Sequence, residues 1–474
     1  MTFVVSLPSS PPYSALVVVV VGGGVEEVET FPSLPPSRRG SDSDVLLYSN
    51  SIIGVMFPPL LKNNVSAIPG LCPVEWGVSS ISEMIGPTAG HADRRRAIRS
   101  EKRRSEEEVR VLREAREALL AFYFSDFVCF CGCESHRCGR EEMAAKTVLI
   151  TGAAGQIGYS LVPLIASGQL FGENVPVNLH LLDIEQAQGV LGGVVMEIED
   201  GAYPLVRKVV ATTSMAEACK DVDAAFLVGG FPRLAGMERK DVMAKNVGIF
   251  QSMGRSLNEH ASPEIKVLVV ANPANTNASI LRDNAPRIPA ANITAMTRLD
   301  HNRALGMLAK KTGVEGGASA VRNVIIWGNH SSTQVPDADH ATVGGQPARA
   351  AVKDDAWLES EFVKTVQQRG AAVIAARKLS SAMSAANAAV DHMRSWVRGT
   401  AAGEVVSMGV FGNGQYGSPK DVCFSLPCTC AGGKWTVVEG LSVSERVAGL
   451  MKLSADELIE EKALALQCLA EMAK

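Results

Sequence analysis

The sequence lacks a hydrophobic run long enough to cross a membrane. The longest apolar run near the N-terminus extends only from Ala15 to Val21, whereas a membrane-spanning helix needs about 20 consecutive apolar residues. We therefore expect a soluble protein that has no membrane partner.

The sequence also lacks an excess of charge of one sign. Its net charge of −4 and its pI near 6.1 over 474 residues exclude a general electrostatic preference for nucleic acid. A basic cluster does occur between Arg94 and Arg104, but glutamates such as Glu101 interleave with it. A charged, solvated helix is the favoured interpretation, so no nucleic-acid partner is predicted. A nucleic-acid-associated factor is the alternative, and it would require a strongly salt-dependent affinity.

A regular cysteine framework is missing as well. The ten cysteines follow no repeating spacing, which is typical of free thiols in a reducing compartment. The densest group consists of Cys129, Cys131, Cys133, His136 and Cys138. It lacks the paired Cys-x-x-Cys knuckles that place four zinc ligands tetrahedrally. We therefore predict no metal site, with zinc binding by this group as the alternative.

In residues 1–142, Pro-Ser stretches alternate with short apolar runs that show neither helical nor strand periodicity. Such a segment is predicted to be a poorly ordered extension. It lacks the basic start of a signal peptide, and early acids such as Glu26 are atypical of an organelle transit peptide. We hypothesise that the working protein begins at or near Met143. The extension would then be a dispensable tail or upstream sequence that is not normally translated.

What the sequence does contain is a stretch typical of a dinucleotide-binding turn. An apolar strand that begins at Thr147 runs into three glycines at three-residue spacing, Gly152, Gly155 and Gly158. Glycine lets the chain turn sharply, approach a pyrophosphate closely and pack the next helix against the strand. The helix that begins near Gln156 would offer unpaired N–H groups and its positive dipole end to the phosphates.

A second feature supports this interpretation. Residues 177–184 form the next predicted strand, with Asp183 at its carboxyl end. An acidic residue there would hydrogen-bond the adenosine ribose hydroxyls and repel a 2′-phosphate, so the predicted cofactor is NAD rather than NADP. The alternative is that Asp183 is only a helix cap or turn residue.

From Thr147 onward, strand and helix patterns alternate as a doubly wound parallel sheet requires. The predicted strands are Val148–Ile150, Val177–Leu182, Val209–Thr212, Ala224–Val228 and Val267–Ala271. We therefore predict an α/β protein whose Rossmann-type dinucleotide-binding domain, residues 143–297, precedes an α+β substrate-binding and catalytic domain, residues 298–474. Ligands bind at the carboxyl ends of strands in such folds, so the loops there are expected to carry the chemistry.

Two loops of the first domain have the side chains for this. In residues 229–239, Arg233 and Arg239 flank the flexible Gly236, as a loop that closes over an anionic substrate would need. In residues 271–277, Asn272 follows a strand and could hydrogen-bond a substrate oxygen. The alternatives are two solvated surface arginines and a structural Asn-Pro turn.

The second domain supplies a candidate proton relay. Asp300 and Arg303 are three residues apart, which places them on one face of a helix. His330 follows a predicted strand that begins at Val324. Histidine suits proton transfer from a hydroxyl, because its pKa lies near neutrality and a buried aspartate can fix its tautomer.

From about Met143 to the C-terminus, the sequence closely resembles the NAD-dependent malate dehydrogenases of the cytosolic type, within the lactate/malate dehydrogenase superfamily. The motifs that carry the resemblance are residues 151–158, 232–241, 271–277, 297–303, 325–334 and 367–371. The resemblance implies reversible oxidation of (S)-malate to oxaloacetate with NAD, and hence a dicarboxylate substrate. It also implies a homodimer and a cytoplasmic location, while the unexplained extension leaves an organelle open.

The resemblance further implies roles for the polar residues. His330 would be the proton acceptor and Asp300 its partner. Arg303 would grip the C1 carboxylate of the substrate, Arg239 would polarise the reacting carbonyl, and Arg233 would bind the distal carboxylate. A buried cation that faces a methyl group would be unpaired and costly, so oxaloacetate is expected to be accepted and pyruvate rejected.

The implied cofactor site includes the glycine-rich turn. Asn272 would in addition contact the substrate hydroxyl. The expected cofactor contacts are Gly152, Ala153, Ala154, Gly155, Gln156, Ile157, Gly158, Asp183, Asn246, Val270 and Asn272.

The sequence departs from the family pattern in places. Met253 stands where relatives often carry a glutamine that contacts the cofactor, and residues 314–320 are expected to form a lengthened surface loop. Residues 367–397, rich in alanine and serine, are predicted to be one helix.

Two alternative functions remain. One is a plastid-type enzyme that uses NADPH and is switched by thiols. The other is a catalytically idle NAD-binding scaffold, which would have no need of the proton relay.

Overall fold

The computed structural model describes residues 144–231, 239–472 and 474. The predicted extension, its cysteine and arginine clusters and Arg233 lie outside these residues. Arg239 is described only as the first residue of a helix, and its side chain is not.

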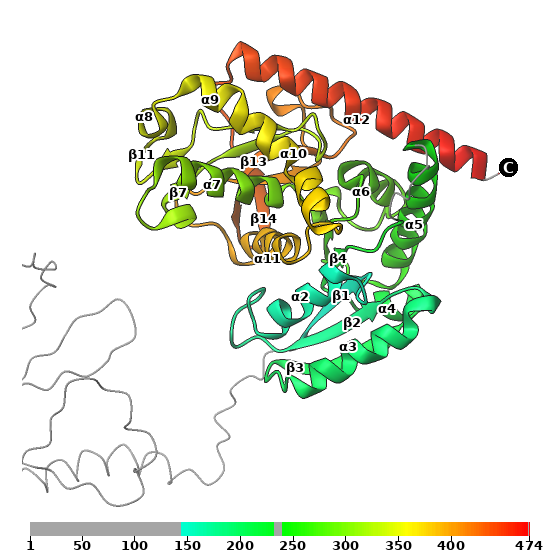
Figure 1. Ribbon diagram of the computed structural model, residues 1–474. Helices are drawn as coiled ribbons and strands as arrows, with labels where there is room; N and C mark the ends of the chain where they lie inside the picture. Colours follow the sequence, from blue (N-terminus) through cyan, green and yellow to red (C-terminus); the bar gives the residue numbers. More distant parts are fainter. Residues whose placement is uncertain (1–143, 232–238, 473) are drawn as a thin grey trace, which may run out of the picture. The chain divides into compact units, whose positions relative to one another are not determined.

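The first half contains a six-stranded parallel sheet (Figure 1). Its strands lie in the order β6-β5-β4-β1-β2-β3, the order of a doubly wound dinucleotide-binding fold. Their bounds are β1 Lys146–Thr151, β2 Val177–Leu182, β3 Val206–Thr212, β4 Ala224–Leu227, β5 Lys266–Val269 and β6 Ile293–Ala295. The five strands predicted in this half are therefore all present, with ends that differ by a few residues.

Helices cover both faces of this sheet, because successive side chains of a strand point to opposite faces. Val148 and Ile150 of β1 lie in one core cluster, whereas Leu149 lies in another. The first cluster includes residues of α2 and α3, and the second includes residues of α5 and α6. The helices are α2 Gln156–Ala166, α3 Gln188–Asp200, α4 Met215–Cys219, α5 Arg239–His260 and α6 Ala274–Asp283.

The second half mixes helices with short antiparallel strands. Three strands extend the large sheet beyond β6: β12 Val406–Val410, β13 Phe424–Ala431 and β14 Lys434–Val437. The smaller sheets consist of β7 Val321–Arg322, β10 Thr342–Val343 and β11 Gln346–Pro347, and of β8 Ile325–Trp327 and β9 Val335–Asp337. The helices are α7 Arg298–Thr312, α8 Ala348–Val352, α9 Asp355–Glu359, α10 Glu361–Arg377, α11 Met383–Arg398 and α12 Glu445–Met472.

Short 3₁₀ turns connect several of these elements. They are η3 Glu185–Ala187, η4 Ala290–Asn292, η5 Gly317–Ala320 and η6 Gln415–Gly417. Residues 315–319 are exposed, so the expected surface segment at 314–320 is present and ends in a 3₁₀ turn.

The prediction of one helix over residues 367–397 is wrong. Helix α10 ends at Arg377, and α11 begins only at Met383. Lys378 adopts a left-handed conformation with φ of 62°, and its N–H closes α10 by donating to the carbonyl of Ile374 at 2.8 Å. The alanine-rich sequence favours helix locally, whereas the fold places a turn here that brings Ser381 to Arg303.

The long C-terminal helix α12 connects the two halves (Figure 1). It contacts β9 of the second half, and it packs against α5 and α6 of the first. In the first half, Ala465 is fully buried in the core that also contains Val247 and Phe250 of α5. No helix within the described residues is both long and apolar enough to span a membrane.

Candidate active site

The glycine-rich turn between β1 and α2 leaves no room for side chains. Gly152 has φ of +65°, and a Cβ there would lie 2.8 Å from the Cα of Gly229. A Cβ on Gly158 would lie 2.4 Å from the carbonyl oxygen of Gly152. The turn is thus packed against both the end of β4 and the start of α2. This backbone cradle fits the pyrophosphate of a dinucleotide, because only glycine permits such close approach.

Asp183 follows the end of β2, beside this turn. One carboxylate oxygen accepts a hydrogen bond from the N–H of Ala154 at 2.9 Å, and the other accepts from Ile184 at 2.8 Å. The side chain is half-buried. Asp183 is therefore bonded to the glycine-rich turn, and it also has the local turn contact expected of its structural alternative.

Asn246 anchors the chain where it enters the loop after β4. The side chain is fully buried; its Oδ1 accepts from the N–H of Phe231 at 2.8 Å. Its Nδ2 donates to the carbonyls of Phe231 and Val242, each at 3.0 Å. These bonds hold the last described residue before the loop against α5. The direct cofactor contact expected of Asn246 stays a prediction.

The loop after β5 lies at the same edge of the sheet. Val270 is 7% exposed and belongs to the core, whereas Asn272 is exposed. Asn277 closes the loop by donating from Nδ2 to the carbonyl of Ala271 at 2.9 Å. Asn272 thus lies just beyond the carboxyl end of β5, the edge at which ligands bind in this fold.

The candidate proton relay lies in the second half. Asp300 is fully buried in the first turn of α7, and its carboxylate is hydrogen-bonded to His330 Nδ1. Arg303, one turn further along α7, donates from Nη1 to the other oxygen of Asp300 at 2.9 Å. The side chains of Arg303 and His330 are 13% and 15% exposed. The structure therefore brings together the three residues that the sequence singled out, with one carboxylate between two cationic partners.

This arrangement shifts the ionisation of both partners. Burial opposes the charge on Asp300, but His330 and Arg303 outweigh it and hold the pKa of this carboxyl below its usual value. Burial likewise opposes the charge on His330, but the Asp300 carboxylate outweighs it and raises the pKa of the imidazole. The pair therefore favours a charged imidazolium facing a carboxylate.

The structure adds residues that sequence reasoning did not single out. The Oδ1 of Asn275 accepts a hydrogen bond from the backbone N–H of His330 at 3.0 Å. Ser381, in the turn between α10 and α11, accepts from Arg303 at 3.3 Å. Asn275 is fully buried, and its place within the 271–277 motif was the signal available in the sequence. Ser381 offered none, because its contact depends on the turn.

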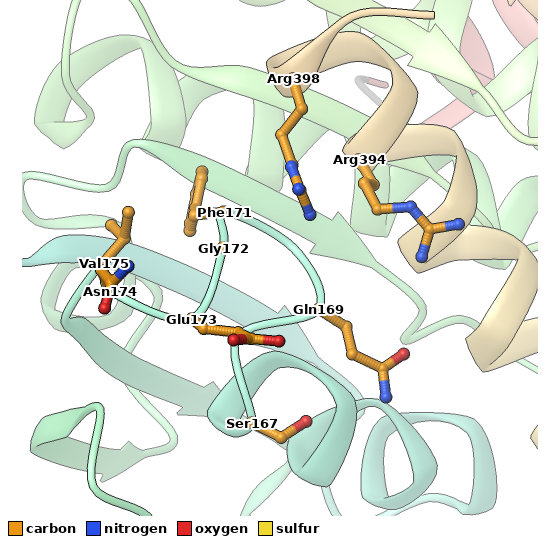
Figure 2. Close-up of a pocket in the computed structure, with 10 residues that line it drawn as sticks. Ser167, Gln169, Phe171, Gly172, Glu173, Asn174, Val175, Arg394 and Arg398 are labelled. Atoms are coloured by element: carbon orange, nitrogen blue, oxygen red, sulfur yellow. The ribbon is translucent and has the colours of Figure 1, made fainter. Parts of the chain in front are cut away.

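A cavity among the described residues lies away from the glycine-rich turn and from the proton relay. It has a volume of about 710 Å³ and is lined by residues that follow the C-terminal end of α2 and by Arg394 and Arg398 of α11. Figure 2 shows these arginines across from Glu173 and Gln169. The cavity is at the opposite end of α2 from the glycine-rich turn. It is therefore separate from the candidate active site.

The described residues contain no cluster of three or more potential metal ligands. Their five cysteines, Cys219, Cys423, Cys428, Cys430 and Cys468, are free and buried. Burial raises the pKa of Cys219 to about 11 and that of Cys430 to about 12. Such thiols are poor nucleophiles, which gives no support to a thiol switch within this part of the chain.

Two family models match the chain. The NAD binding domain of lactate/malate dehydrogenase matches residues 146–294, and the alpha/beta C-terminal domain of lactate/malate dehydrogenase matches residues 297–468. The chain belongs to the lactate/malate dehydrogenase family. The expected family, the Rossmann-type fold and NAD as the cofactor are thereby confirmed.

The chain matches similar proteins of this family over nearly the whole length of those proteins. The chain is 58% identical over 327 residues to the cytoplasmic malate dehydrogenase of Medicago sativa, covering 68% of this chain and 98% of the relative. A malate dehydrogenase structure from Naegleria fowleri is 47% identical with a TM-score of 0.66, covering 69% and 99%. A Trichomonas vaginalis lactate dehydrogenase in complex with NADH and oxamate is 40% identical with a TM-score of 0.66, covering 69% and 100%. Both malate and lactate dehydrogenases thus share 40% or more sequence identity with this chain.

Proposed function

We propose that the chain catalyses the reversible oxidation of (S)-malate to oxaloacetate with NAD, and that His330 is the proton acceptor. The observation that carries this proposal is the buried carboxylate of Asp300, hydrogen-bonded to His330 Nδ1 and to Arg303. The relatives of highest identity reported above are malate dehydrogenases. A scaffold that only binds NAD would have no use for such a relay.

The relay accounts for the proton that leaves the substrate. Asp300 keeps a proton on Nδ1 of His330, so the unprotonated Nε2 is left to receive the hydroxyl proton of malate. When bound, NAD⁺ supplies the acceptor for the hydride that leaves the same carbon. The carbon–oxygen double bond forms as both hydrogens depart, and Asp300 stabilises the resulting imidazolium. In the reverse direction, His330 returns its proton to the carbonyl oxygen of oxaloacetate.

Arginines would orient the dicarboxylate. Arg303 lies beside the relay and would grip the C1 carboxylate, while Arg239 would polarise the carbonyl and Arg233 would pair with the distal carboxylate. Asn272 would contact the substrate hydroxyl. Discrimination against pyruvate would follow from Arg233, since a methyl group cannot pair with a buried cation.

The cofactor would lie across the edge of the first sheet. The tight turn from Gly152 to Gly158 fits a pyrophosphate, and Asp183 would bind the ribose hydroxyls and exclude a 2′-phosphate. Residues 143–297 would form this NAD-binding unit, and residues 298–474 would supply the substrate site.

A second copy of this chain is the proposed partner. Helices α2 and α3 expose apolar side chains, with Tyr159 46%, Val190 59% and Met196 64% exposed. Exposed apolar faces of this kind mark association surfaces. Light scattering coupled to gel filtration tests the proposed homodimer, and Met196→Glu should shift the mass toward the monomer. The cytoplasm is the proposed compartment, because the Medicago sativa relative is cytoplasmic by name.

The decisive experiment measures the rate of NADH oxidation by the purified full-length protein. Oxaloacetate and pyruvate are compared at equal concentrations, and NADPH is run beside NADH. We expect fast turnover only with oxaloacetate and NADH. Faster turnover of pyruvate would contradict the substrate assignment, and preference for NADPH would contradict the role of Asp183.

A further inference from the structure

The loop that carries His330 is held from the C-terminal helix α12. The Oε2 atom of Glu457 accepts hydrogen bonds from Asn329 Nδ2 at 2.9 Å, Ser331 Oγ at 2.5 Å and Thr333 Oγ1 at 2.6 Å. Asn329 and Ser331 are the two sequence neighbours of His330. One carboxylate of α12 therefore fastens the loop on both sides of His330.

Ser454 reinforces this contact from the preceding turn of α12. Its Oγ accepts from the N–H of Asn329 at 2.8 Å and lies 3.0 Å from Thr333 Oγ1. A Cβ added to Gly328 would lie 2.2 Å from this Oγ. The loop thus packs so closely on α12 that only glycine fits at position 328.

One pattern of donors directs the hydroxyl protons of both Ser331 and Thr333 to Glu457. In this pattern the proton between Thr333 and Ser454 comes from Ser454, and the 2.9 Å contact between Ser331 Oγ and Thr333 Oγ1 carries no proton. Ser331 donates to Glu457 and accepts from the N–H of Thr333 at 3.0 Å. Every hydroxyl proton of the cluster is then engaged, and Glu457 accepts as a carboxylate.

The same helix also binds the segment that contacts the backbone of His330, residues 275–276. Glu461, one turn beyond Glu457, is 5% exposed and accepts from Thr276 Oγ1 at 2.6 Å. The residue before Thr276 is Asn275, whose Oδ1 accepts from the N–H of His330. Two acidic residues of α12 therefore support the site. Glu457 binds the residues on either side of His330, and Glu461 binds the residue next to Asn275.

We propose that Glu457 is a positioning residue for the reaction, fastening residues 329–333 to α12 so that the His330 ring stays in line between Asp300 and the substrate. This inference rests on the proposed function. Glu457 binds the residues beside His330 rather than the imidazole, so it acts through the loop. A catalytic group must be held within about 0.5 Å of its productive position, and a carboxylate with three donors on a rigid helix provides that restraint.

The test compares variants of the full-length protein. Glu457→Ala should lower kcat for oxaloacetate reduction on the order of 10- to 100-fold, the cost of misplacing a reacting group. The Kd for NADH, measured by fluorescence, should remain at its wild-type value, because the contacts of Glu457 described above go to the loop of His330 and not to the glycine-rich turn. Glu457→Gln keeps one acceptor oxygen and should restore most of kcat.

The matched control is the neighbouring carboxylate of the same helix. The side chain of Asp456 is 50% exposed, and in the structure it pairs with Lys452 at 2.8 Å. Asp456→Ala should therefore keep wild-type kcat. Equal kcat for folded Glu457→Ala and Asp456→Ala would overturn the proposal.

A second measurement is independent of turnover. The imidazole of His330 is titrated by NMR in the wild-type protein and in Glu457→Ala, or in Thr333→Val should the alanine variant not fold. Because contact with Asp300 raises the pKa of His330, a displaced ring should titrate at lower pH. An unchanged titration would overturn the positioning role. Absence of turnover in the wild type would instead refute the proposed function, and the NMR comparison would still decide the role of Glu457.

Discussion

Asp300 links Arg303 to His330 through the two oxygens of one carboxylate. The bond to Arg303 Nη1 is 2.9 Å long, the other oxygen is bonded to His330 Nδ1, and Asp300 is fully buried. The cation proposed to grip the substrate and the proposed base therefore share a single counter-ion. Substrate binding and proton transfer should be electrostatically coupled.

Replacing Asp300 by asparagine should remove most of the activity. The amide cannot stabilise the imidazolium and favours the wrong tautomer of His330, so kcat should fall by about 10³- to 10⁴-fold. Steady-state NADH oxidation with oxaloacetate measures the loss, and NADH fluorescence verifies that the cofactor still binds. Asp354→Asn, at a surface residue paired with Lys311, is the control. Retention of a tenth or more of wild-type kcat by Asp300→Asn, roughly a 1.4 kcal/mol effect, would contradict the relay.

The coupling should be visible in the pH profiles of the reaction. Oxaloacetate reduction needs protonated His330, so its rate should fall as the pH rises through the raised pKa of this imidazole. The charge of Arg303 lowers that pKa, and a substrate carboxylate on Arg303 would offset this effect. The falling limb of kcat should therefore lie at higher pH than the limb of kcat/KM, which reports the free enzyme. A kcat limb at lower pH would contradict the placement of the carboxylate on Arg303.

Adding one methyl group to the glycine-rich turn should weaken cofactor binding. The Cβ of Gly158→Ala would lie 2.4 Å from the carbonyl of Gly152, so the turn must move away from its observed shape. We expect the Kd for NADH to rise at least tenfold, roughly 1.4 kcal/mol. Gly306→Ala is the matched control, since a Cβ there meets nothing within 4 Å. Wild-type affinity in Gly158→Ala would argue that the cofactor does not use this turn.

Removing Arg233, the proposed partner of the substrate's distal carboxylate, should reduce the preference for oxaloacetate over pyruvate. Arg233→Gln should lower kcat/KM for oxaloacetate by about 10²-fold or more, as expected for breaking a buried charge pair worth about 3–5 kcal/mol. The rate with pyruvate should change much less, so the ratio between the substrates should narrow. Arg322→Gln, on an exposed position of β7, serves as the control. An unchanged ratio in Arg233→Gln would assign discrimination to other residues.

Local patterns in the sequence predicted the architecture well. The spacing of Gly152, Gly155 and Gly158 and the alternation of strand and helix patterns are set by short-range sterics and by burial on two faces. The neighbourhood of Asp300 and Arg303 was also predictable, because a three-residue spacing in a helix determines it. His330 follows the short buried strand β8, as the sequence predicted.

Contacts between distant segments were not predictable. Glu457 meets Asn329 across 128 residues, and in the sequence it is one of many acids on an amphipathic helix. The break between α10 and α11 depends on the tertiary contact of Ser381 with Arg303, which overrides the helical preference of the surrounding alanines. These features arise only once distant segments of the second half pack together.

The buried thiols can report local unfolding of the protein, because each is accessible to a reagent only when the structure around it opens. Cys423, Cys428 and Cys430 lie in or beside β13, whereas Cys468 lies in α12. A thiolate attacks an alkylating reagent as the nucleophile, so each of these buried cysteines should become labelled only when its surroundings separate. Peptide mapping after timed exposure would then rank the opening rates of the sheet and of the C-terminal helix without any engineered probe.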